Sequence, residues 1–400
     1  MIVHHAKTAA MKILSTIFLI LITLNTKSSA QSFQVGHKKQ TFIDASRSNR
    51  NITTEIYYPA DMSGDNVSIA SGQFPVLVFG HGFLMTWSAY SNIWNDIVPN
   101  GYIMVFPTTE TNLFPSHTNF GKDIAFLVGA MKTEGTNTSS TFFAGVATTS
   151  AAMGHSMGGG SAFLSIQYDP SITALATLAA ANTNPSSIDA AKNIGIPSIV
   201  IAGANDCVAP PPQHQLPMYD ALSSACKTYV TITGGSHCQF ANTNTNCSLG
   251  ELTCSPPPDI SPMSQQNITS ILLLSWLNYY LKNESDSGVE FQNLITTGNG
   301  IESQQNCLLL STKDSEHKNK SVINIYPNPF SSETTMETDI FMKNATISIY
   351  NNLGKPVKQL TNIFGNKVSL SRVGMSSGLH YLILTESNRI IATKQIIVKD

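Results

Sequence analysis

The sequence is poor in charged residues. Only 12% of its 400 residues are Asp, Glu, Lys or Arg, and the formal net charge is −2 at pH 7. A chain without a surplus of Lys and Arg offers no basic surface to a phosphate backbone, so we expect no nucleic-acid partner. Its abundant Ser, Thr and Asn fit a secreted protein, and its 42% hydrophobic content is ordinary for a globular core.

The apolar run near the N-terminus is too short for a typical membrane-spanning helix. A lysine precedes Ile13–Leu24, and the small residues Ser28-Ser29-Ala30 follow it. A basic residue, a short apolar segment and small residues are the three parts of a secretory signal peptide. The sequence therefore predicts a signal peptide over residues 1–30 and a mature chain that begins near Gln31, with Met11 as a second candidate start.

The sequence also lacks any C-x-x-C pair. Its six cysteines are Cys207, Cys226, Cys238, Cys247, Cys254 and Cys307. Without paired ligands of this kind we expect no metal site. Export to an oxidising compartment would permit disulfides, so the cysteines are expected to form bridges or to remain inert thiols.

A glycine-rich turn surrounds one serine, in Gly154-His155-Ser156-Met157-Gly158-Gly159-Gly160. It follows a strand-like run, Thr148–Met153, and precedes a helix-like run, Ser161–Tyr168. A G-x-S-x-G turn between a strand and a helix exposes the serine as a nucleophile, and its glycines leave room for the sharp turn. The motif also occurs by chance, so the serine needs a histidine and a carboxylate from elsewhere in the chain.

Short apolar runs alternate with helical patterns in the first three quarters of the chain. Strands are expected over residues 40–44, 51–58, 75–79, 102–106, 148–153, 172–178, 198–202 and 229–233. Helices are expected over residues 119–132, 161–168, 218–226 and 268–281. Apolar strands separated by helices indicate a mostly parallel sheet with helices on both faces. We therefore expect an α/β catalytic domain over residues 31–283.

Two residues in loops after buried strands fit the partners of Ser156. Asp206 follows one predicted strand, and His237 follows the next. Nucleophile, acid and base in this chain order are typical of an α/β-hydrolase triad. We predict that Ser156 is the nucleophile, His237 the general base and Asp206 the carboxylate that orients the histidine. His155 is the second candidate base, but its place beside the nucleophile favours a position that lines the cleft or packs beneath it.

A tetrahedral intermediate also needs two backbone donors. The residue after the nucleophile, Met157, is expected to supply one amide. The loop Gly80-His81-Gly82-Phe83 is expected to supply the other, from Phe83. His81 is expected to shape this turn rather than to transfer protons.

Residues 284–320 are polar and lack a clear hydrophobic period, so we expect a linker there. Beyond it, strands are expected over residues 322–325, 345–350, 367–370, 381–385 and 390–398, separated by turn residues. The pattern predicts a small C-terminal all-β sandwich over residues 321–400.

These residues resemble the lipase, cutinase and polyester-hydrolase branch of the α/β-hydrolases, which includes poly(ethylene terephthalate) hydrolases. The resemblance covers about residues 32–281. It rests on Gly80-His81-Gly82-Phe83, Gly154-His155-Ser156-Met157-Gly158-Gly159, Ala204-Asn205-Asp206 and Ser236-His237. It implies an α/β-hydrolase fold and a serine esterase that forms an acyl-enzyme and uses no cofactor. It also implies that Phe83 clamps the acyl group of the substrate and that Met157 faces it.

The chain departs from this branch at one aromatic position. Several polyester hydrolases carry a tryptophan in the loop after the strand that follows the elbow helix. Here that loop reads Ala180-Ala181-Asn182-Thr183-Asn184-Pro185, and the tryptophans are Trp87, Trp94 and Trp276. The aromatic wall against the acyl group is therefore absent or comes from another residue, for which Phe240 is the candidate.

The C-terminal residues resemble the sorting domain of the type IX (Por) secretion system. The resemblance covers about residues 321–400 and rests on Tyr326-Pro327-Asn328-Pro329-Phe330, on residues 347–354 and on the terminal strand with Lys394. It implies an outer-membrane secretion machinery as partner, and a protein that is secreted or attached to the outer surface. The other interpretation of the tail is a carbohydrate-binding or adhesive β-module.

The cysteine positions suggest one pairing. Cys207 directly follows the expected acid, and Cys238 directly follows the expected base. If acid and base meet at one edge of the sheet, these cysteines should be near neighbours, so we predict a Cys207–Cys238 disulfide. Cys226 should lie at the opposite end of the sheet. Cys247 and Cys254 are the rival partners, and they are also able to pair with each other.

The sequence therefore predicts a secreted, monomeric serine esterase that acts on lipid-like or polymeric esters. No long insertion lies between Ala180 and Pro197, which favours an open cleft for bulky substrates. A short-chain carboxylesterase or lipid acetylhydrolase is the second hypothesis. A surface binding protein with an inactive hydrolase scaffold is the third, and the presence of Ser156, Asp206 and His237 argues against it.

Overall fold

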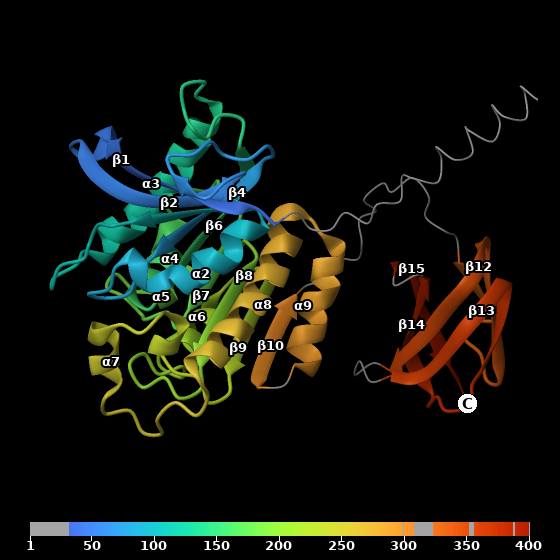
Figure 1. Ribbon diagram of the computed structural model, residues 1–400. Helices are drawn as coiled ribbons and strands as arrows, with labels where there is room; N and C mark the ends of the chain where they lie inside the picture. The colour runs from blue at the N-terminus through green and yellow to red at the C-terminus, as the bar shows by residue number, and fades with distance from the viewer. Residues whose placement is uncertain (1–31, 299, 308–322, 352–355, 387–388, 400) are drawn as a thin grey trace, which may run out of the picture. The chain divides into compact units, whose positions relative to one another are not determined.

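The computed structural model describes residues 32–298, 300–307, 323–351, 356–386 and 389–399 (Figure 1). The expected signal peptide lies outside the described residues. The chain divides into two compact units, with the boundary after residue 308. Within the described part of the chain, no helix is long and apolar enough to cross a membrane.

The first unit is built on one ten-stranded sheet. Its strands are β1 (Gln34–Asp44), β2 (Arg50–Ala60), β3 (Gly64–Asp65), β4 (Phe74–Gly80), β5 (Ile103–Pro107), β6 (Val146–His155), β7 (Ala174–Leu178), β8 (Ser198–Gly203), β9 (Cys226–Ile232) and β10 (Ile301–Cys307). They lie in the order β10-β9-β8-β7-β6-β4-β5-β2-β1-β3. The strands from β4 to β9 are parallel, while β2 joins β5, and β10 joins β9, in antiparallel pairs.

Helices cover both faces of this sheet. They are α2 (Ser91–Ile97), α3 (His117–Thr136), α4 (Met157–Ser165), α5 (Ser187–Ala191), α6 (Gln215–Ala221), α7 (Thr245–Glu251), α8 (Pro262–Lys282) and α9 (Ser285–Thr297). Strand β4 shows how the two apolar layers divide. Its Leu77 and Phe79 join the layer formed with α2, α8 and α9, whereas Val76 and Val78 join the layer formed with α3, α4 and α6. Because both faces are covered, the central strands are continuously apolar, and the expected α/β architecture is confirmed.

The chain between residues 284 and 307 is not a linker, contrary to our expectation. Helix α9 packs beside α8 and buries Phe291 and Ile295 in the apolar layer on that face. Strand β10 then extends the sheet beyond β9 (Figure 1). Its composition is polar because it is an edge strand, and α9 needs only a narrow apolar stripe to pack. The sequence pattern of a linker and that of such edge elements are therefore alike.

The second unit is all-β, as expected. Its strands are β11 (Ile323–Tyr326), β12 (Glu333–Asn351), β13 (Pro356–Ser371), β14 (Gly378–Glu386) and β15 (Arg389–Val398). They form a single antiparallel sheet in which the long β12 pairs with β11 and β13 by its first half and with β13 and β14 by its second half. A separate core, which includes Phe330, Met336 and Leu382, lies within this unit. A core of its own indicates that the unit folds as a domain.

The position of the domain boundary gives a first prediction. A chain that ends at residue 320 keeps α9 and β10 and should unfold at the same temperature as the first unit of the full chain. A chain that ends at Glu284 loses the burial of Phe291 and Ile295, roughly 1.5–3 kcal/mol each, and exposes β9 as a new sheet edge. It should melt at a lower temperature and aggregate. Equal melting temperatures for the two truncated chains would contradict the assignment of α9 and β10 to the first unit.

Candidate active site

The parallel strands bring the predicted site residues to one edge of the sheet. Ser156 follows β6, Asp206 lies three residues after β8, and His237 lies in the loop after β9. The carboxyl ends of parallel strands share an edge, which is where α/β proteins hold their ligands. The side chains named from the sequence therefore come from loops at the same edge.

Ser156 occupies the sharp turn between β6 and α4. Its backbone has φ 56° and ψ −121°, a strained conformation for a residue with a side chain. Its carbonyl accepts hydrogen bonds from the amides of Gly160 and Ala181 at 3.0 and 2.9 Å, and these bonds hold the turn. The turn also packs closely on the end of β4, because a Cβ on Gly158 would lie 2.1 Å from the Gly80 oxygen. Gly80 and Gly158 therefore have no room for side chains, because their backbones are in contact.

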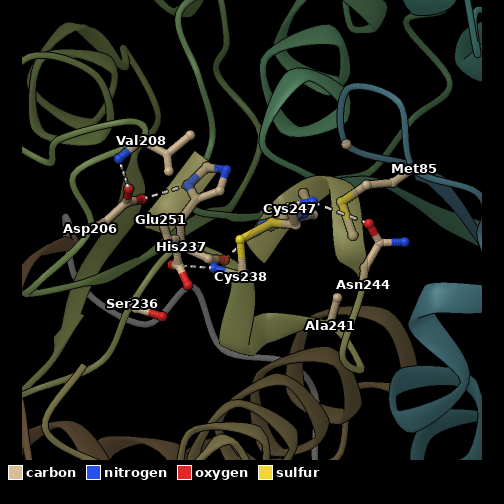
Figure 2. Close-up of a disulfide and its surroundings, with 12 residues drawn as sticks. Met85, Asp206, Val208, Ser236, His237, Cys238, Ala241, Asn244, Cys247 and Glu251 are labelled. Carbon is tan, nitrogen blue, oxygen red and sulfur yellow. Dashed lines mark hydrogen bonds and ion pairs between the residues drawn. A yellow bond between two sulfur atoms is a disulfide. The ribbon is translucent and has the colours of Figure 1, made fainter. Parts of the chain in front are cut away.

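Asp206 and His237 form a buried hydrogen-bonded pair. The Nδ1 atom of His237 donates to Oδ2 of Asp206 at 2.7 Å, and both side chains are almost wholly excluded from solvent (Figure 2). The other carboxylate oxygen accepts from the amides of Val208 and Ala209 at 2.9 and 2.8 Å. These donors hold the carboxylate in place beside the imidazole. With its proton on Nδ1, the imidazole keeps a free lone pair on Nε2, which is the state that a general base requires.

His155 lies beneath this pair rather than in an open cleft. It is fully buried, and its Nε2 atom donates to the carbonyl oxygen of His237 at 2.9 Å. Burial, with a further contribution from nearby His237, holds the pKa of His155 well below its usual value, so the ring is neutral. The two imidazole rings are 4.8 Å apart between centroids. The residue before Ser156 thus supports the loop of the candidate base, and of the two positions expected for His155 the buried one is correct.

Phe240 does not supply an exposed aromatic wall. It is fully buried, with its ring 6.2 Å from that of His155 between centroids. The expectation that it stacks on substrate is therefore wrong, because its ring belongs to the apolar layer under the site. Phe83 is different: 46% of its surface is exposed. Met157 is the first residue of α4 and is nearly buried, so Phe83 remains the exposed aromatic candidate for substrate contact.

Two polar residues that the sequence did not single out also contact the site. Glu251 on α7 accepts a hydrogen bond from the amide of Cys238, the residue after His237, at 2.7 Å (Figure 2). Tyr90 receives a hydrogen bond from the amide of Gly82 at 2.8 Å. Neither residue lies in a recognisable motif, and both act on backbone groups across the fold. Only the folded structure shows such contacts.

The expected Cys207–Cys238 disulfide is wrong. Cys207 is bonded to Cys254, and Cys238 is bonded to Cys247. The side chains of Asp206 and His237 turn toward each other, so the next side chain on each loop faces elsewhere and meets the segment around α7; Figure 2 shows this for Cys238 and Cys247. The third bridge joins Cys226 to the terminal residue of β10, Cys307. The loops of Asp206 and His237 are therefore each tied to one end of the α7 segment rather than to each other.

Helix α7 packs against the loops of Asp206, His237 and Phe83. A Cβ on Gly250 would lie 3.5 Å from Val208, so α7 packs on the acid loop. Asn246 donates to the carbonyl oxygen of Leu84 at 2.8 Å, next to Phe83. Leu249 and Leu252 are 60% and 75% exposed. The described residues contain no cluster of His, Cys, Asp and Glu that could hold a metal ion.

The disulfide connectivity gives a second prediction. Non-reducing peptide mapping should link Cys207 to Cys254 and Cys238 to Cys247. These bridges span 47 and 9 residues, so by the chain-entropy model their removal should cost about 4 and about 3 kcal/mol of unfolding free energy. Denaturant unfolding of the two double Cys→Ser variants measures these costs. A peptide that joins Cys207 to Cys238 would overturn the pairing.

Comparison with known proteins yields two family matches. Residues 25–255 match the model of the PET hydrolase-like family, and residues 324–399 match that of the secretion system C-terminal sorting domain. Among curated relatives, the cutinase est1 of Thermobifida alba is 26% identical over 196 residues, which is 49% of this chain and 60% of the relative. A bis(hydroxyethyl) terephthalate hydrolase of Streptomyces coelicolor is 26% identical over 204 residues, 50% of this chain and 59% of the relative. The chain thus spans about three fifths of the curated relatives that it matches.

Proposed function

Because the chain belongs to the PET hydrolase-like family, we propose that it is a carboxylic ester hydrolase with Ser156 as nucleophile, His237 as base and Asp206 as its orienting acid. The observation that carries the proposal is the buried hydrogen bond of 2.7 Å between His237 and Asp206. It lies at the sheet edge where the strained turn presents Ser156. A nucleophile, a base and an orienting group in this relation form the usual machinery of acyl transfer.

The reaction proceeds in two halves. In the first, Oγ of Ser156 attacks the ester carbonyl carbon while Nε2 of His237 takes the serine proton. The amides of Phe83 and Met157 donate to the oxyanion that forms. The intermediate collapses, the alcohol leaves with the proton from His237, and an acyl-enzyme remains on Ser156. In the second, His237 takes a proton from water, the hydroxide attacks the acyl carbon, and the acid product leaves as Ser156 regains its proton.

Asp206 stabilises the charged state of His237 in both halves. The imidazolium that forms at each proton transfer lies against a carboxylate that is excluded from water, where the attraction is stronger than in solution. The hydrogen bonds from the amides of Val208 and Ala209 fix the position of that carboxylate. The carboxylate of Asp206 is therefore already in place to stabilise the imidazolium of His237 before the substrate binds.

We propose bulky or polymeric esters as substrates. The segment between residues 180 and 197 contains only the five-residue helix α5, so it offers no long lid. Leu249, Leu252 and Phe83 are exposed, and α7, which carries Leu249, packs on the loops of Asp206 and Phe83. A short-chain carboxylesterase would not need this surface. The second candidate function is nevertheless a carboxylesterase for soluble esters, because Phe240, the candidate for the aromatic wall, is buried.

The C-terminal sorting domain makes the chain an exported protein, secreted or held at the outer surface. Its partner is proposed to be the secretion machinery of the outer membrane, which would bind the all-β unit. That unit has its own core, so recognition by the machinery does not require the hydrolase unit to be altered. The adhesive or carbohydrate-binding interpretation of the tail has no support from the family match.

The third prediction tests the nucleophile. Ser156→Ala should reduce hydrolysis of a p-nitrophenyl ester by at least about 10³-fold, because only the serine oxygen can form the acyl-enzyme. Its melting temperature should stay close to that of the unchanged protein. Ser165→Ala, at the end of the helix that follows Ser156, removes a buried hydroxyl that donates to the carbonyl of Ala162 and serves as control. Retention of more than a few per cent of the activity in Ser156→Ala would end the assignment.

The fourth prediction separates polymeric from soluble esters. At low enzyme concentration, the double variant Leu249→Ser with Leu252→Ser should release product from polyester film roughly 30-fold more slowly or worse, because each leucine that is covered on adsorption contributes roughly 1–2 kcal/mol and about 1.4 kcal/mol corresponds to a factor of ten. Its kcat/KM on a soluble ester should not change. Ile43→Ser with Val289→Ser removes two exposed apolar residues on β1 and α9 and should leave both rates unchanged. An equal loss on film and on soluble ester would contradict a role in surface contact.

A further inference from the structure

Two fully buried polar side chains, Tyr90 and His155, lie between the loop of Gly82 and the loop of His237. Tyr90 is the last residue of the short 3-10 helix η2 (Trp87–Tyr90), and His155 is the last residue of β6. The Tyr90 hydroxyl contacts Nδ1 of His155 at 3.0 Å. Neither side chain is placed to react with substrate, because both are closed off from the surface. Their hydrogen bonds join the loop of Gly82 to the loop of His237 on the buried side of the site.

The direction of each hydrogen bond follows from the groups involved. The His237 carbonyl can only accept, so Nε2 of His155 carries the proton. The ring is neutral, so its Nδ1 accepts, and the Tyr90 hydroxyl donates to it in preference to the Met85 sulfur, a weaker acceptor 3.4 Å away. Burial raises the pKa of Tyr90, which keeps the hydroxyl proton in place. The Tyr90 oxygen in turn accepts from the amide of Gly82 at 2.8 Å.

The result is an ordered chain of donors from the oxyanion loop to the base. It runs from the Gly82 amide to Tyr90, from Tyr90 to His155, and from His155 to the carbonyl of His237. Gly82 immediately precedes Phe83, whose amide is the expected oxyanion donor. A Cβ on Gly82 would lie 3.2 Å from Nδ1 of His155 and 3.3 Å from the Tyr90 oxygen, so the loop backbone rests directly on this pair.

We propose that Tyr90 and His155 are positioning residues that fix the position of the oxyanion loop relative to the general base. The proposal rests on the proposed function and names further residues that serve it. Apolar side chains of similar size would fill the same space, but they would not fix the distance between Gly82 and His237. Each hydrogen bond in the chain has one direction. Together the three bonds fix the position of the Gly82 loop relative to the His237 loop.

The expected effect is on turnover rather than on substrate binding. The oxyanion amides act on charge that exists only in the transition state and the intermediate. Complete loss of one such donor typically lowers kcat about 10²–10³-fold. A displaced donor should cost less, so we expect a loss of about 10-fold when the chain of hydrogen bonds is interrupted.

The experiment compares two tyrosines. Tyr90→Phe removes only the hydroxyl of the chain, and Tyr102→Phe removes a buried hydroxyl that donates to Asn278 at 2.7 Å. Tyr102 precedes β5 and so lies at the opposite edge of the sheet from the site. Both variants lose one buried hydrogen bond and should lose comparable stability. On a soluble p-nitrophenyl ester, Tyr90→Phe should show about 10-fold lower kcat with KM within twofold, and Tyr102→Phe should show neither change.

A second variant tests whether Tyr90 acts through His155. His155→Phe keeps a ring of similar size but removes both the donor toward the His237 carbonyl and the acceptor for the Tyr90 hydroxyl. Because both substitutions break the Tyr90–His155 hydrogen bond, the double variant should have a kcat no lower than that of the worse single variant. If Tyr90→Phe does not fold, His155→Phe alone should still show the lower kcat at unchanged KM.

Three results would overturn the proposal: an unchanged kcat in Tyr90→Phe, an equal loss of kcat in Tyr102→Phe, or losses that simply add in the double variant. These results are distinct from failure of the proposed function. If Ser156→Ala abolishes turnover and Tyr90→Phe does not lower it, only the positioning role fails. If Ser156→Ala remains active, the proposed function fails whatever the tyrosines do.

Discussion

The site depends on a carboxylate and an imidazole that are both removed from water and are held against each other. Burial of a charge is costly unless its hydrogen-bonding positions are filled. Those of Asp206 are filled by His237 and by the amides of Val208 and Ala209. The base is held on two more sides, since His155 donates to its carbonyl and Glu251 accepts from the amide that follows it. Loss of any of these neighbours would leave a buried polar group without a partner.

The parts of the site that lie close together in the chain were predictable from the sequence. A glycine on each side of Ser156, and a polar residue soon after each buried strand, are local patterns with a physical cause. The parallel sheet brings their positions together, so the edge that carries them could be inferred as well. The disulfides could not be inferred in this way. Adjacency to Asp206 and His237 says where the backbone lies but not which way the cysteine side chains point.

The misassigned linker has a related cause. Periodicity detects elements that are buried on a broad face, and β10 and α9 are peripheral. Among the described strands, β10 has only β9 as a partner, and all of its side chains are exposed or half-buried. The contacts that recruit it, such as the pairing of Cys307 with Cys226, join residues that are 81 positions apart. Tyr90 was not predicted for a related reason, because its hydroxyl bonds to Gly82 in the loop after β4 and to His155, 65 positions away at the end of β6.

Two of the three disulfides lie where the sheet gives the chain least support. Between the end of β9 and the start of α8, about thirty residues contain only a 3-10 turn and the short helix α7, so few backbone hydrogen bonds order them. The bridges of Cys207 and Cys238 limit this segment at both ends of α7, and they offset part of the entropy that its ordering costs. Such bridges form in oxidising compartments, and the sorting domain directs the chain out of the cell. The loops of Asp206 and His237 are therefore braced by bonds that become available only where the protein is exported.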